Sequence, residues 1–222
     1  MVVTALTPDP RQSGYLVVDL DRARYASLPL EVVSQLGLSV GAEVQGELAD
    51  RVKRAADVEA AYTVATRLLA MRPRSVYEVL ARLRERGHNP SAAAEAVGRL
   101  EAAGVLDDAT FARHFARVRA PRGHGPSRLL HDLLAKGVDR RLAERAIEEV
   151  MDADGMNGTS QARALALKRA QQLKGLALPQ QRRRLLAYLA RRGFRGRDVQ
   201  DMVAEMLKAG NTDESRSNDL IR

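Results

Sequence analysis

A spacing of two leucines, a glycine and an aliphatic residue occurs three times in this chain. The copies are Leu80, Leu83, Gly87 and Val97; Leu130, Leu133, Gly137 and Ile147; and Leu186, Leu189, Gly193 and Val203. In each copy the leucines share one helical face, the glycine ends that helix, and a second helix follows. The glycines are 50 and 56 residues apart, which leaves room for three helices in each copy. Because one such unit buries its apolar face poorly alone, we expect the units to stack.

The repeat therefore predicts a mainly α fold, with three tandem three-helix repeats that form an elongated, curved stack behind a small β-containing N-terminal extension. The predicted segments are the extension at 1–50, repeat 1 at 55–104, repeat 2 at 105–153, repeat 3 at 159–208 and a disordered tail at 209–222. Aromatic residues make up only 4% of the chain and Trp is absent. The core must then consist of Leu, Ala and Val, which favours helices over a sheet sandwich.

The pattern of apolar residues, prolines and glycines places the individual elements. Helices are expected near 57–70, 75–86 and 91–103, from 107 onward, and near 127–136, 139–151, 160–174, 179–192 and 197–208. In the extension we expect strands at 15–20 and 24–28, joined by Asp21-Arg22-Ala23, then a short helix at 30–36 and a last strand within 38–44. So small a sheet is marginal alone and should pack on the helices.

Several functional classes are unsupported by the sequence. The chain has no cysteine, its four histidines lie in different predicted elements, and it has no phosphate-binding glycine loop. The acidic pair at Asp107 and Asp108 sits where a helix begins, so we interpret it as capping rather than acid–base chemistry. We therefore expect no enzyme, no catalytic residue, no metal and no cofactor. Without a membrane-length apolar run or a secretory signal, we expect a cytoplasmic, monomeric protein with no membrane partner.

Charge is distributed unevenly along the chain. The formal net charge is +8, but residues 1–50 carry −4 and the remainder carries +12. Residues 160–197 contain eleven Lys or Arg and no Asp or Glu. A surface of this kind attracts polyanions by long-range attraction and by counterion release. Scattered arginines are often only solvated helix faces, but a stretch of this length without acids favours a binding role.

The basic residues of repeat 3 fall into rows on the helix expected at 179–192. Arg183, Ala187 and Arg191 form one row at four-residue spacing, and Arg184, Tyr188 and Arg192 form the next. Tyr188 either stacks on a base or a guanidinium, or is a half-buried packing residue. The predicted interface for a filament or DNA comprises Lys168, Arg169, Lys174, Arg183, Arg184, Tyr188, Arg191, Arg192, Arg195 and Arg197. A secondary basic patch comprises Arg72, Arg74, Arg113, Arg117, Arg119, Arg122 and Arg128.

Three groups of residues in repeats 1 and 2 carry a family resemblance. They are Arg72-Pro73-Arg74-Ser75 with Glu78 and Leu83; Gly104-Val105-Leu106-Asp107-Asp108 with Phe111, Ala112 and Arg119; and Gly125-Pro126-Ser127-Arg128-Leu129 with Leu133 and Lys136-Gly137-Val138. In this order and spacing they resemble the RecX family, bacterial regulators of the RecA recombinase, over about residues 55–208. The β-type extension resembles one that some members carry. Two departures from the usual pattern are the short Gly-Pro-rich segment after Arg119 and the strongly basic repeat 3.

The resemblance implies a non-catalytic modulator that lies along the RecA filament on single-stranded DNA and limits recombinase and coprotease activity in DNA repair, recombination and the SOS response. Contact with single-stranded DNA, and weaker contact with duplex DNA, would accompany RecA binding. The alternative is a direct nucleic-acid-binding regulator, because Gly87, Gly137 and Gly193 each join two helices as in a helix-turn-helix unit. The featureless start at Ser91-Ala92-Ala93-Ala94 counts against it, and Arg140-Arg141 is the better candidate for base contacts. A plain helical scaffold would leave the acid-free repeat 3 unexplained.

Overall fold

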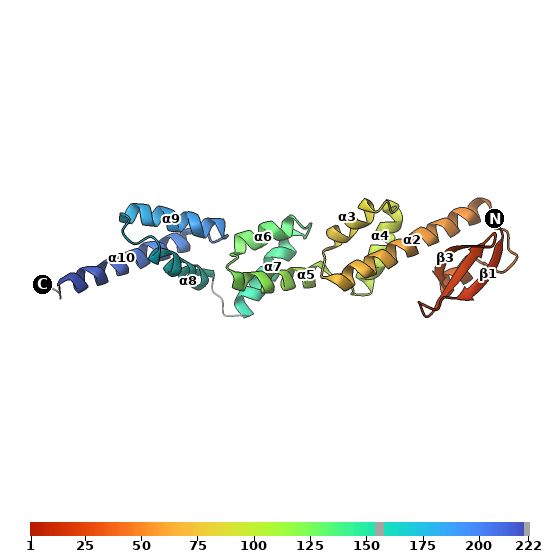
Figure 1. Cartoon of the computed structure of the whole chain (residues 1–222), viewed down its shortest axis with the longest axis horizontal. Helices are drawn as coiled ribbons and strands as arrows, with labels where there is room; N and C mark the ends of the chain where they lie inside the picture. Colours follow the sequence, from red (N-terminus) through yellow and green to blue (C-terminus); the bar gives the residue numbers. More distant parts are fainter. Residues whose placement is uncertain (154–157, 220–222) are drawn as a thin grey trace. The chain divides into compact units, whose positions relative to one another are not determined.

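A computed structural model describes residues 1–153 and 158–219, with side chains described up to residue 209. The chain divides into two compact units, Met1–Asp107 and Asp108–Arg222. The first contains the extension and repeat 1, and the second contains repeats 2 and 3 (Figure 1). The prediction of a mainly α fold, with three-helix repeats following a small sheet, is confirmed.

An antiparallel sheet forms the extension. Its described strands are β1 (Val3–Pro8), β2 (Tyr15–Leu20) and β3 (Ala23–Pro29), in the order β1-β2-β3. Val18 of β2 pairs with Leu6 on one side and Ala26 on the other. The hairpin between β2 and β3 turns at Asp21 and Arg22, which both take positive φ, at 48° and 66°, as the right-handed twist of a two-residue turn requires.

The sheet differs from the prediction at both of its ends. Strand β1 was not expected, because its alternation of apolar and polar residues is weak. The strand predicted within 38–44 is wrong, since that segment contributes only an isolated bridge between Val2 and Glu43. Gly41 turns the chain there at a φ of 89°. The short helix α1 (Leu30–Gln35) follows β3 as expected.

The helix α2 (Gly46–Met71) contributes to two hydrophobic cores. Near its start, Val52 packs with Leu28 and the other buried residues of the sheet. Towards its end, Ala61 and Ala65 pack into the core of repeat 1. The prediction of a helix starting near 57 is therefore too short. Because neither Gly nor Pro occurs between residues 47 and 71, nothing in the backbone interrupts the helix.

A buried carboxylate joins these two cores. Glu59 of α2 is only 5% exposed. The hydroxyl of Tyr15 in β2 donates to it at 3.2 Å, and the guanidinium of Arg99 forms an ion pair with it. Arg99 also lies over the ring of Tyr62, 4.4 Å from its centroid. The sheet, α2 and repeat 1 are therefore tied by one polar network, as a buried charge requires.

Repeat 1 is completed by α3 (Val76–Glu85) and α4 (Pro90–Ala102). Ser75 caps α3. Its hydroxyl accepts a hydrogen bond from the Glu78 N–H at 3.1 Å, and the Glu78 carboxylate accepts from the Ser75 N–H at 3.4 Å. This reciprocal capping box satisfies two of the N–H groups that a helix start leaves unpaired.

The second unit consists of repeats 2 and 3. Repeat 2 contains α5 (Asp108–Arg119), the 3₁₀ turn η1 (Ala120–Arg122), α6 (Pro126–Leu134) and α7 (Arg140–Ala153). Repeat 3 contains α8 (Gly158–Gln171), α9 (Leu178–Arg191) and α10 (Arg197–Asp219). The backbone of α10 thus runs to residue 219, where a disordered tail was expected from residue 209; with no proline to stop it, adding residues to a formed helix costs little. Residues 220–222 lie outside the described part of the chain.

The middle helix ends in the same way in every repeat. The second motif leucine, which is Leu83, Leu133 or Leu189, is fully buried in each core. Its carbonyl accepts from the N–H of the residue after the glycine, at 3.1, 3.2 and 3.0 Å in repeats 1, 2 and 3. The glycines Gly87, Gly137 and Gly193 have φ of 80°, 76° and 89°. This is the Schellman arrangement, in which glycine takes the left-handed conformation at no steric cost.

In repeat 3 this turn also packs against repeat 2. The Gly125 N–H donates to the Arg192 carbonyl at 2.7 Å, and the Ser127 N–H donates to the Gly193 carbonyl at 3.2 Å. A β-carbon on Gly193 would lie 2.4 Å from the Arg128 nitrogen, and one on Gly125 would lie 2.7 Å from Gly193. The two backbones approach so closely that only glycine fits at either position.

None of the described helices is both long enough and apolar enough to cross a membrane.

The junction of repeats 2 and 3 is tested by Gly193→Ala, with Gly175→Ala as the matched control. Gly175 lies in the same repeat at a φ of 88°, with open space around its α-carbon. Both variants should lose about 1–2 kcal/mol because alanine disfavours positive φ. Gly193→Ala should lose about 1–3 kcal/mol more, since its methyl group overlaps repeat 2. Urea unfolding measures the difference.

Hydrogen exchange provides a second measure of the same junction. Gly193→Ala should lower the protection of the Gly125 and Ser127 amides, while Gly175→Ala should leave it unchanged. Equal stability and equal exchange in the two variants would contradict the close packing.

Candidate nucleic-acid interface

Helix α9 separates an apolar face from a basic one. Leu185 and Leu189 are fully buried in the core of repeat 3, and Leu186 is packed against that core, as predicted. Arg183, Arg184 and Arg191 are exposed, and Arg192 is half-buried. We call Arg183, Arg184, Tyr188, Arg191 and Arg192 the α9 stripe. Arg182 is exposed beside them, although the row pattern did not select it.

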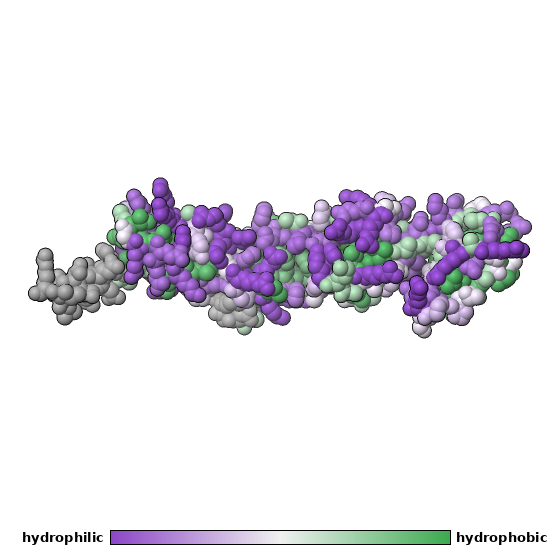
Figure 2. All heavy atoms as spheres, viewed as in Figure 1, coloured by the Kyte–Doolittle hydropathy of each residue, from purple (hydrophilic) through white to green (hydrophobic). Residues whose placement is uncertain are grey.

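The cations of the α9 stripe have no carboxylate partner in the described part of the chain. Elsewhere arginines are paired: Arg54 with Glu95 at 2.9 Å and Arg140 with Glu144 at 3.3 Å, for example. The difference follows from the sequence, since residues 160–197 contain no acid. Like charges at helical spacing repel one another, so this surface favours the binding of an anion. Figure 2 shows hydrophilic residues over much of the visible face of repeat 3.

Tyr188 is half-buried and packs against the core of repeat 3. Two guanidinium groups lie over its ring: the Arg192 carbon is 4.9 Å and the Arg169 carbon 5.8 Å from the ring centroid. Tyr188 therefore combines the packing role with a stacking one, although its stacking partners within the chain are arginines.

The other predicted interface residues come before and after the α9 stripe in the sequence of repeat 3. Lys168, Lys174, Arg195 and Arg197 are exposed, and Arg169 is half-buried. Arg169 donates to the Gln172 side chain, and Arg195 donates to the Ala190 carbonyl at 3.5 Å. Only Arg197 approaches an acid among the described residues of this set, Asp201 at 4.0 Å.

The secondary basic patch is divided between the two units. In repeat 1, Arg72 forms a two-point ion pair with Glu78, with both distances 3.2 Å. Arg74 is buried, and its Nε donates to the Leu68 carbonyl at 3.2 Å. Burial, followed by the nearby charge of Arg72, lowers the pKa of Arg74. The expectation that Arg74 faces a ligand is therefore corrected. Its guanidinium instead donates to a backbone carbonyl in the last turn of α2.

In repeat 2 the remaining arginines of the patch have few carboxylates near them among the described residues. Arg113 lies 3.9 Å from Glu149, and Arg117 is exposed on α5. Arg119 lies over the Phe115 ring at 4.1 Å from its centroid. Asp132 is the common partner of three groups, with distances of 3.8 Å to Arg119, 3.9 Å to His124 and 4.0 Å to Arg128. One carboxylate held at such distances offsets only part of the positive charge.

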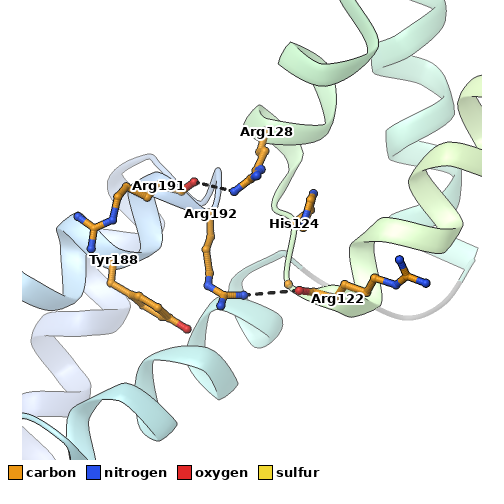
Figure 3. Close-up of a pocket in the computed structure, with 7 residues that line it drawn as sticks. Arg122, His124, Arg128, Tyr188, Arg191 and Arg192 are labelled. Atoms are coloured by element: carbon orange, nitrogen blue, oxygen red, sulfur yellow. Dashed lines mark hydrogen bonds between the residues drawn. The ribbon is translucent and has the colours of Figure 1, made fainter. Parts of the chain in front are cut away.

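A pocket of about 410 Å³ lies where α9 meets the loop before α6. We call it the junction pocket; its lining is Arg122, Gly123, His124, Arg128, Tyr188, Arg191 and Arg192. Two guanidiniums cross the junction in opposite directions (Figure 3): Arg192 donates to the Arg122 carbonyl at 3.5 Å, and Arg128 donates to the Arg191 carbonyl at 3.4 Å. The pocket thus joins residues of the two predicted patches. Sequence spacing could not pair them, since they lie more than 60 residues apart.

His124 is the residue of this pocket that the sequence analysis did not select. Its Nδ1 is buried and has no hydrogen-bond partner among the described residues. Burial lowers the pKa of His124 below its ordinary value, and the charges of Arg128, Arg119 and Arg192 lower it further, while Asp132 opposes them. The sequence signal was the loop Gly123-His124-Gly125-Pro126, in which close-packed glycines bracket the imidazole. The described residues contain no cluster of His, Asp or Glu suited to a metal ion.

Comparison with known proteins gives consistent matches. The chain matches the family models of the first, second and third three-helix domains of RecX, over residues 61–100, 107–147 and 159–203. A regulatory protein RecX from Halorhodospira halophila is 34% identical over 161 residues, which cover 71% of this chain and 92% of the relative. Another from Lactobacillus delbrueckii subsp. bulgaricus is 29% identical over 221 residues, which cover 97% of this chain and 79% of the relative.

Two crystal structures have the same fold. One, described as regulatory protein RecX, has a TM-score of 0.74 at 18% identity and covers 92% of this chain and 98% of its own. The other, RecX from Lactobacillus salivarius, has a TM-score of 0.60 at 21% identity and covers 69% of this chain and 97% of its own.

The environment of His124 predicts a specific loss of stability in acid. A lowered pKa means that the unfolded chain binds a proton more readily than the folded one, so stability falls as the pH drops below about 6.5. His124→Gln should remove this part of the pH dependence, giving a melting temperature less sensitive to pH between 7.5 and 5, by a few degrees. His131→Gln on α6, an exposed position, is the control. Equal acid sensitivity in the two variants would contradict the assignment.

Proposed function

Since this chain belongs to the RecX family, we propose that it regulates the RecA recombinase by binding the RecA filament on single-stranded DNA. It would limit recombinase and coprotease activity without catalysing a reaction, and so act in DNA repair, recombination and the SOS response. Relatives over most of the chain are named regulatory protein RecX, which supports a regulatory role. The elongated, curved stack, the monomeric state and the cytoplasmic location remain predictions.

The observation that carries the proposal is the unpaired charge of the α9 stripe. Three arginines of α9 and Arg192, which caps its C-terminal end, have no acidic partner in the described residues. Binding to a polyanion such as filament DNA would relieve their mutual repulsion and release counterions. Acidic patches of the recombinase are the other surface in a filament that this charge fits. Both contacts are consistent with a regulator that acts on the assembled filament.

The proposal is tested with Arg183→Glu/Arg184→Glu in RecA filaments on single-stranded DNA. The wild-type chain should inhibit ATP hydrolysis and strand exchange at substoichiometric amounts. The double variant should weaken this inhibition about tenfold or more, because four units of charge change on the binding surface. Its folding should be unaffected, since both residues are exposed and unpaired among the described residues and glutamate suits the first half of a helix.

The matched control is Arg141→Glu/Arg145→Glu, the same charge reversal at two exposed positions of α7. It should inhibit as the wild type does. A loss confined to the α7 variant, accompanied by DNA binding without recombinase, would instead favour the helix-turn-helix alternative. No effect of the wild-type chain on RecA would refute the proposed function itself.

A further inference from the structure

The junction pocket contains two guanidiniums with weak partners. Arg128 and Arg192 each donate to a neutral backbone carbonyl, at 3.4 and 3.5 Å, the outer limit for a hydrogen bond. A guanidinium has five N–H donors in a planar fork, so most of this capacity is unused by the contacts described here. Charge-assisted bonds to an anionic oxygen are shorter and about twice as strong as neutral ones. A phosphate at this place would therefore be a better acceptor than either carbonyl.

The positive charge around the pocket is only partly compensated, since Asp132 lies 4.0 Å from Arg128. Its lining includes Arg122, Arg128, Arg191 and Arg192, and the nearest described carboxylate is Asp132, which also serves Arg119 and His124. The lowered pKa of His124 has burial as its main cause and the positive field of these arginines as the next. His124 lines the pocket, and its Nδ1 is buried without a hydrogen-bond partner among the described residues, 3.9 Å from Asp132.

We propose that the junction pocket binds one phosphate group of single-stranded DNA through Arg128 and Arg192, with the neighbouring base stacked on Tyr188. This rests on the proposed function and adds to it a defined site for the strand. Arg192 now covers the Tyr188 ring. On binding, it turns from the ring and from the Arg122 carbonyl to the phosphate, and the base takes its place on the ring.

The junction itself does not need to open for this exchange. The two guanidinium–carbonyl bonds are broken, but the bonds from the Gly125 and Ser127 N–H groups to the Arg192 and Gly193 carbonyls, at 2.7 and 3.2 Å, remain. The volume of about 410 Å³ falls within the usual range of small-ligand sites, about 300–1,000 Å³. The site is therefore preorganised, and only the two arginine side chains change position.

A nucleic-acid strand fits this pocket better than an acidic peptide does. Guanidinium forks match a carboxylate as well as a phosphate, so the arginines alone do not decide between the two. The aromatic ring beside them does, because a base offers a planar face at the next position along a strand and stacking on it is tolerant of sequence. An acidic peptide offers such a face only where an aromatic residue lies beside the carboxylate, whereas every nucleotide carries one.

The direct test measures binding of fluorescently labelled oligo(dT) to the full chain, without recombinase. Arg128→Gln/Arg192→Gln should bind about tenfold or more weakly than the wild type. The negative slope of log K against log salt between ~50 and ~200 mM should become less steep by about 1. The control Arg141→Gln/Arg145→Gln removes the same charge from α7 and should change affinity less than about twofold. If the pocket variant binds as the control does, the proposal is overturned.

Tyr188 gives a second variant pair with little risk to folding. Tyr188→Phe keeps the ring and should bind oligo(dT) as the wild type does, whereas Tyr188→Leu keeps apolar bulk but loses stacking and should bind about tenfold more weakly. Equal affinity of the two would overturn the stacking part.

A further measurement identifies the source of the phosphate. The Nε–Hε signals of Arg128 and Arg192 in NMR spectra should shift with oligo(dT), and with inorganic phosphate only at far higher concentration. Saturation by inorganic phosphate at the same concentration as oligo(dT) would overturn the assignment to a strand.

Normal oligo(dT) binding with lost RecA inhibition in the pocket variant would assign the pocket to an acidic protein surface instead. Because the binding assay contains no recombinase, failure of the proposed function would appear separately, as a wild-type chain that binds oligo(dT) but leaves RecA unaffected.

Discussion

A glycine in the left-handed conformation after a buried leucine is the constraint on which each repeat depends. It turns the chain from the middle helix into the last one and places the next apolar residue against the same core, as Val138 and Phe194 show. In repeat 1 the space beside the turn glycine, Gly87, is open. In repeat 3 the turn at Gly193 also contacts Gly125 of repeat 2. The same turn therefore ends the middle helix of repeat 3 and packs against the neighbouring repeat.

The electrostatics follow from where acids occur in the sequence. In repeats 1 and 2, arginines alternate with glutamates and aspartates, and many form ion pairs such as Arg54–Glu95 and Arg140–Glu144. Exposed pairs of this kind contribute little to stability, but they neutralise the surface. Repeat 3 lacks the acids up to residue 197, so its cations remain available for an external anion. The same helix that closes a hydrophobic core with Leu185 and Leu189 thus carries the candidate interface on its other side.

The sequence predicted those features that are periodic or local. The leucine and glycine spacing predicted the repeats. The four-residue rows selected Arg183, Arg184 and Arg191, which are exposed, but also the half-buried Arg192, and they missed the exposed Arg182. It did not predict contacts between residues distant in sequence. The junction pocket depends on Arg122 and Arg192 meeting across two repeats, and the burial of Arg74 depends on the carbonyl that ends α2. Strand β1 lacks a clear alternation of apolar and polar residues. The start of α2 at Gly46 lies before the repeat, so the repeat spacing does not predict it.

The sharing of α2 between two cores means that this protein has no clean border between its extension and its repeats. A shortened chain that began inside α2 would lack the sheet that packs on Val52 and would leave Glu59 without the Tyr15 hydroxyl. The remaining helix would keep its contacts with repeat 1 but expose apolar side chains that had faced the sheet. Fragments intended to isolate the repeats therefore need a cut before residue 46 together with polar replacements on the uncovered side of the helix.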